Sequence, residues 1–146
     1  MSTQDQIKNL EVLQAAVEAQ PEALFDLSKY QQATPCGTLF CTIGLATTLP
    51  HFQQQGFYMA SEPLPYSERP FTGVKVGEKW IFDSGVAPQF FGAHFDDLFS
   101  PAGCGDVDED LGYYYHEKLD EYSMTDRELA IARIEYQLAL LQPEEA

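Results

Sequence analysis

The segment from residue 35 to residue 57 is the most apolar part of the chain, and it constrains the fold more than any other feature. Apolar residues surround nearly the whole circumference of a helix drawn over 38–49, and Pro50 stops that helix. This pattern predicts a central, buried helix. Gly44 costs it about 1 kcal/mol of helix propensity unless another element packs closely there. The residues expected in the core are Leu39, Ile43 and Ala46.

Amphipathic helices are predicted towards both ends of the chain. Over 3–19, apolar residues recur at helical spacing, and Ser2 precedes them as an N-cap. Over 126–141, Thr125 and Glu128 have the spacing of a capping box ahead of an apolar stripe. Both segments therefore have start signals as well as periodicity.

The middle of the chain predicts three further elements. Residues 72–82 alternate in hydrophobicity around Gly77-Glu78, which is typical of a β-hairpin. We expect Trp80 to anchor this hairpin by packing between it and the helical layer. The proline-rich residues 58–71 predict an irregular surface segment, and the aromatic spacing over 88–99 predicts a short helix.

Length and composition set the fold class. A chain of 146 residues with 45% hydrophobic side chains is large enough for one domain with its own core. We therefore expect a single α+β domain over residues 1–146, mostly α-helical, with one β-hairpin packed on a helical core.

The charge of the chain excludes several classes of function. The chain contains eight basic and 23 acidic residues, which gives a formal net charge of −15. Binding to a nucleic-acid backbone or to an anionic membrane needs clustered Lys and Arg, so neither is expected. Residues 1–10 have no apolar core of a signal peptide, and no apolar run reaches the ~20 residues of a membrane span. These features favour a cytoplasmic protein with reduced cysteines.

The acidic residues are concentrated in residues 92–121, which contain nine acids and only Lys118 as a base. Such a segment projects a negative potential and favours a basic partner protein. The leading hypothesis is a non-enzymatic binding protein. One form of it is a phage-type inhibitor that imitates nucleic acid by presenting carboxylates to a basic groove. The candidate binding residues are Asp106, Asp108, Asp110, Tyr113, Tyr114, Glu117, Asp120 and Glu121.

Two parts of this segment have alternative interpretations. Three consecutive tyrosines, Tyr113 to Tyr115, are typical of a protein contact surface, but they also fit one buried ring and two lying along the surface. The acids from Asp106 to Glu117 stand at positions 1, 3, 5 and 12 of a calcium loop, where Leu111 replaces the required glycine. The simpler interpretation is a solvated acidic loop, and a third possibility is that the charge serves only solubility.

The alternative function is a small metal- or thiol-dependent enzyme. It would use Cys36, Cys41, Cys104 and a histidine, with His116 completing a Cys3His zinc set. Cys36 and Cys41 are separated by four residues rather than the usual two, and Cys41 also fits a small core residue. Cys36 at a helix start would have a lowered thiol pKa, but no base stands beside it in the sequence. No cofactor is therefore expected, with zinc and calcium as the alternatives.

The stretch Cys36-Gly37-Thr38-Leu39-Phe40-Cys41-Thr42-Ile43-Gly44 resembles a loose family of small, uncharacterised bacterial and phage proteins with a Cys-Gly-Thr-x-x-Cys-x-x-Gly pattern. The resemblance covers most of residues 24–141. It includes Phe25-Asp26-Leu27-Ser28 upstream, and Pro50-His51-Phe52, Gly56-Phe57, Leu98-Phe99 and Arg133-Ile134 downstream. It implies that the Cys-Gly-Thr segment opens a packed helix. It implies no activity.

Overall fold

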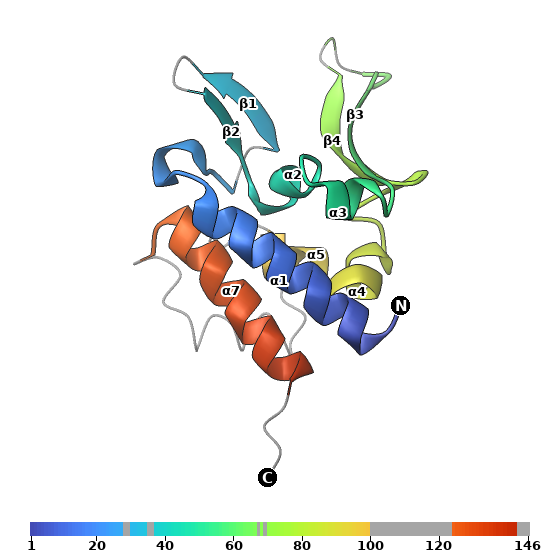
Figure 1. Ribbon diagram of the computed structural model, residues 1–146. Helices are drawn as coiled ribbons and strands as arrows, with labels where there is room; N and C mark the ends of the chain where they lie inside the picture. The colour runs from blue at the N-terminus through green and yellow to red at the C-terminus, as the bar shows by residue number, and fades with distance from the viewer. Residues whose placement is uncertain (28–29, 35–36, 67, 69, 100–123, 143–146) are drawn as a thin grey trace.

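Helices α1 (Thr3–Ala19) and α7 (Asp126–Leu141) lie side by side in the computed structural model, with their apolar faces together (Figure 1). Each begins with a capping box. The Ser2 hydroxyl accepts from the Asp5 N–H while the Asp5 carboxylate accepts from the Ser2 N–H, and Thr125 and Glu128 do the same. These reciprocal bonds satisfy N–H groups that a helix start leaves unpaired. Both predicted helices are confirmed. The structure describes residues 1–27, 30–34, 37–66, 68, 70–99 and 124–142.

The first turn of α7 closes the other end of α1. The Arg127 Nε donates to the carbonyls of Val17 and Gln20 at 3.2 and 3.1 Å, and its terminal nitrogen donates to the Glu18 carbonyl at 2.6 Å. The last carbonyls of a helix lack their usual intrahelical partners, and here the Val17 carbonyl accepts from the Gln20 N–H as well as from Arg127. The positive guanidinium also meets the negative end of the helix dipole. Arg127 therefore ties the two terminal helices together.

A three-stranded antiparallel sheet contains β3 (Phe57–Glu62), β4 (Phe71–Val76) and β5 (Lys79–Trp80) in that order. The β4–β5 hairpin turns at Gly77, whose φ of 62° favours glycine, so the predicted hairpin is confirmed. The prediction of an irregular segment over 58–71 is wrong for residues 58–62 and for Phe71. Residues 58–62 belong to β3, which pairs with β4 from Phe57↔Val76 to Glu62↔Phe71. The prolines follow the strand rather than interrupt it.

The expected helix over 38–49 is wrong in its first part. Gly37–Phe40 form strand β2, which pairs in an antiparallel hairpin with β1 (Gln31–Thr34). The helix α2 begins only at Thr42 and ends at Ala46, and α3 (Pro50–Gln53) follows. A short apolar run fits a strand as well as a buried helix, and here pairing with β1 decides between them. The expected core position of Leu39 is therefore wrong, because it lies half-buried in β2, whereas Ile43 and Ala46 are fully buried.

Gly44 is the point where α2 meets the preceding segment. A Cβ added there would lie 1.9 Å from the carbonyl oxygen of Tyr30, which is far closer than any van der Waals contact. The backbone of another segment thus packs directly on Gly44, which is the circumstance that accounts for a glycine inside this helix. The resemblance's implication that the Cys-Gly-Thr segment opens a packed helix needs a correction. The Gly-Thr residues of that segment belong to β2, and the helix opens only after the second cysteine, Cys41.

The expected helix over 88–99 is divided into α4 (Val86–Phe91) and α5 (Phe95–Phe99). Gly92 adopts a φ of 74° and ends α4 in a left-handed conformation. The break lets both helices turn aromatic rings into one core. The largest fully buried aromatic side chains are Phe52, Phe57, Phe91 and Phe99.

The fold is mixed α+β, mostly helical, and a single small domain, as predicted. The expectation of one β-hairpin needs a correction, because the described residues form the β1–β2 hairpin and a separate three-stranded sheet. The helices α2 and α3 lie between α1 and the two groups of strands, which rise on the side of α1 away from α7 (Figure 1). In the part of the chain that the structure describes, no helix has both the length and the apolar character to cross a membrane.

Candidate functional site

The acidic and aromatic candidates of the sequence analysis lie outside the described residues. The same holds for three of the four candidate metal ligands. The residues concerned are Asp106, Asp108, Asp110, Tyr113, Tyr114, Glu117, Asp120, Glu121, Cys36, Cys104 and His116. Of the acidic segment 92–121, the structure describes residues 92–99, where Asp97 is 5% exposed and Asp96 is half-buried. These two carboxylates therefore contribute less to the surface than the sequence suggests.

Cys41 is a buried structural residue. It is 2% exposed, and its Sγ accepts from the N–H of Gly44 at 3.4 Å, so the thiol caps the start of α2. Burial raises the pKa of Cys41 to about 11, outweighing the backbone hydrogen bonds that lower it. A thiol nucleophile or zinc ligand needs the thiolate, which this environment disfavours.

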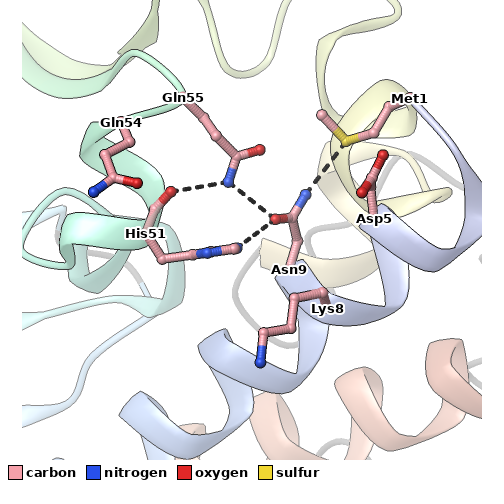
Figure 2. Close-up of a pocket in the computed structure, with 7 residues that line it drawn as sticks. All are labelled: Met1, Asp5, Lys8, Asn9, His51, Gln54 and Gln55. Carbon is pink, nitrogen blue, oxygen red and sulfur yellow. Dashed lines mark hydrogen bonds between the residues drawn. The ribbon is translucent and has the colours of Figure 1, made fainter.

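A polar pocket of about 350 Å³ lies between α1 and α3 and is lined by Met1, Asp5, Lys8, Asn9, His51, Gln54 and Gln55. Asn9 stands at its centre and is 2% exposed (Figure 2). Its Nδ2 donates to the carbonyl of Phe90 at 2.9 Å, which fixes the orientation of the amide. Its Oδ1 consequently accepts from Gln55 Nε2 at 3.0 Å and from His51 Nε2 at 2.7 Å, so Nε2 of His51 must carry a proton.

This network joins α1, α3 and the end of α4 through the Asn9 amide. The Oδ1 of Asn9 accepts two hydrogen bonds, from His51 and Gln55. Its Nδ2 donates two, to the Phe90 carbonyl and, at 3.4 Å, to the Met1 sulfur. The whole hydrogen-bonding capacity of the amide is therefore used. Figure 2 shows that the side chains of Asp5 and Lys8 point to opposite sides of Asn9, so their charges do not converge. Neither His51 nor Asn9 was among the residues that the sequence predicts for a site. The available signal was an amide among the apolar residues of the 3–19 helix.

The described surface is strongly acidic. Two basic residues, Lys8 and Lys79, are exposed in this part of the chain. The other bases there are used internally: Arg133 is 2% exposed, Arg127 closes α1, and Lys75 pairs with Glu62. The exposed acidic residues of this part are Asp5, Glu11, Glu18, Glu22, Glu68, Glu78, Asp83, Glu128 and Glu135.

The outer face of the three-stranded sheet has an aromatic patch, made of Phe71, Trp80 and Phe82. The rings of Trp80 and Phe82 are stacked, with centroids 5.8 Å apart and planes 7° from parallel. The Phe71 ring stands nearly perpendicular to both. Gly73 forms the floor, since a Cβ there would lie 3.1 Å from the Phe71 ring and 3.3 Å from the Trp80 ring. These rings border a pocket of about 310 Å³.

The expectation that Trp80 packs between the hairpin and the helical layer is wrong. Trp80 pairs with Lys75 across the β4–β5 ladder, and directly paired residues share one face of a sheet. The neighbouring Val74 and Ile81 face the core and are fully buried, so alternation turns Trp80 outward. The hairpin is thus anchored by its aliphatic residues, and its largest ring lies half-buried on the outside.

Comparisons with protein-family models, with curated proteins and with solved structures give no match for this chain.

Proposed function

We propose that this chain is a non-enzymatic binding protein whose acidic surface engages a basic partner protein. The observation that carries the proposal is the imbalance of the described surface, where nine exposed acids accompany two exposed bases. The full sequence strengthens it, because the net charge of −15 includes the acidic segment 92–121. A surface of one sign attracts an oppositely charged partner and repels nucleic acid.

The use of the basic side chains supports the same proposal. Arg127 and Arg133 are directed into the fold, and Lys75 is paired with Glu62, so these bases do little to neutralise the surface. Uncompensated like charge destabilises an isolated fold. A basic partner relieves this repulsion when it binds, which links complex formation to a gain in stability.

The environment of Cys41 argues against the thiol-dependent alternative. Its raised thiol pKa and its role as the cap of α2 describe a residue that holds backbone in place. An enzyme that used Cys41 would have to expose and deprotonate it, and both steps oppose the packing of α2.

The test is capture of partners from a lysate on the immobilised chain, followed by mass spectrometry. We expect the enriched proteins to be basic, to elute as salt is raised, and to be depleted when Asp108→Asn and Asp110→Asn are combined. Capture of acidic proteins, or equal capture by the double variant, contradicts the proposal. Competition by duplex DNA for the same partner tests the narrower hypothesis of nucleic-acid imitation.

A further inference from the structure

We propose that the pocket beside the aromatic patch binds an arginine side chain from an extended basic segment of the partner. This inference rests on the proposed function and specifies where part of the partner docks. The pocket is lined by Glu62, Pro63, Leu64, Phe71, Trp80 and Phe82.

The exposed apolar side chains of the described residues are concentrated at this sheet. Six large apolar residues are exposed in that part of the chain. Four of them lie in or next to the sheet: one in β3, two in the β3–β4 connection and one shortly after β5. These four are Tyr58, Leu64, Tyr66 and Phe82, which are 44%, 45%, 99% and 42% exposed. Clustered exposed rings are typical of contact surfaces, whereas scattered ones are ordinary.

The shape of the patch suits a flat cationic group. Trp80 and Phe82 present nearly parallel planes, and Phe71 closes one side at about a right angle. A guanidinium is planar, stacks on aromatic faces and is more weakly hydrated than an ammonium. An arginine side chain therefore loses less hydration free energy than a lysine side chain does when it moves from water into an apolar pocket.

The pocket also contains a carboxylate. Glu62 lines it with a half-exposed side chain, and its Oε1 accepts from the Lys75 ammonium. Lys75 thereby orients the carboxylate. A carboxylate has about four acceptor sites, so Glu62 can accept from a second cation as well. Bidentate or single hydrogen bonds from arginine to a carboxylate are stronger than neutral ones.

Lys75 already places one cation on this patch. Its Nζ lies 5.0 Å from the centroid of the Trp80 ring while it pairs with Glu62. The chain therefore already combines a ring face and a carboxylate around one positive charge. An arginine from the partner repeats this combination on the pocket side of the same ring cluster. The charge of the whole chain, −15, favours a basic occupant over an acidic or neutral one.

The sequence provides a local reporter, because Trp80 is the single tryptophan. The probe is a hexa-arginine amide, titrated into the full chain while tryptophan fluorescence and calorimetric heat are recorded together. We expect both signals to saturate with the same Kd. A hexaglutamine amide of equal length should change neither signal.

Two variants and two matched controls locate the site. Phe82→Ala removes an exposed ring, and Glu62→Gln removes the charge of the carboxylate. Each variant should raise the Kd for hexa-arginine by about tenfold. Leu140→Ala removes an equally exposed apolar side chain on α7, and Glu11→Gln removes an equal charge on α1. The Kd of both control variants for hexa-arginine should stay within about twofold of that of the parent chain. Unchanged thermal melting of Glu62→Gln shows that its effect does not come from unfolding.

The outcomes separate this inference from the proposed function. Binding that leaves Trp80 fluorescence unchanged, or that all four variants weaken equally, overturns the pocket and leaves a basic partner on another part of the acidic surface. Capture of no basic protein in the lysate experiment overturns the proposed function itself. Stronger binding of hexalysine than of hexa-arginine contradicts the choice of a guanidinium.

Discussion

Cys41 should be almost unreactive in the folded protein, and its reaction rate is a direct test of its structural role. The perturbation is a thiol reagent such as Ellman's reagent, added to a chain in which Cys36→Ser and Cys104→Ser leave Cys41 as the single thiol. Only the thiolate reacts. The folded pKa of about 11 against an ordinary value of 9.0 lowers the thiolate fraction near neutral pH by about 100-fold.

Burial lowers the rate further. Cys41 is 2% exposed, so the reagent reaches it only when α2 opens locally. We therefore expect the native chain to react at least about 100-fold more slowly than the same chain in guanidinium chloride, followed by absorbance of the released chromophore. Equal rates in the two states would refute the reasoning and would return Cys41 to the candidates for a catalytic thiol.

The remaining predictions concern the packing of the fold. Gly44→Ala should lower the melting temperature by about 4–8 °C. The added methyl group meets the Tyr30 carbonyl, and the resulting strain of about 3 kcal/mol exceeds the gain in helix propensity of about 1 kcal/mol. An unchanged melting curve would contradict this contact. Arg127→Met should reduce the free energy of unfolding in urea by about 1–3 kcal/mol, since carbonyls at the end of α1 lose a charged donor, and no change would mean that water replaces it. The free energy of unfolding should also fall as pH rises from 9 to about 11, because the Cys41 thiol ionises first in the unfolded chain. Cys41→Ser should remove this part of the decrease.

Local signals made the terminal helices predictable. Ser2 at one helix start and Thr125 with Glu128 at the other act through hydrogen bonds that span three residues, so the sequence alone contains the whole motif. The two-residue connection at Gly77 and Glu78 belongs to the same class, because its geometry depends on the conformation of one glycine.

Contacts between distant segments account for the failures. Residues 37–40 form a strand because residues 31–34 pair with them, and hydrophobic periodicity contains no information about that partner. The carbonyl of Tyr30 over Gly44 is similarly non-local. Each of these features depends on where the chain returns, which a pattern within one segment does not determine.

The aromatic patch was predictable in principle. A two-residue turn after Val76 places Lys79 opposite Val76 and Trp80 opposite Lys75, so Trp80 had to share the polar face of the hairpin. Trp80 was expected to be buried because its ring is large, whereas the alternation of side chains along the strand places it on the outer face. The Asn9–His51 contact, in contrast, joins residues 42 positions apart and has no such local rule.

The most direct test of the proposed function is the salt dependence of the association rate with the captured partner, measured by stopped flow. If the acidic surface attracts the partner, the rate constant should fall by about tenfold or more between about 20 mM and about 500 mM NaCl, and the combined Asp108→Asn and Asp110→Asn variant should associate more slowly at low salt. An association rate that is the same at both salt concentrations, and the same for the variant and the parent chain, would contradict the claim that this protein binds through its negative charge.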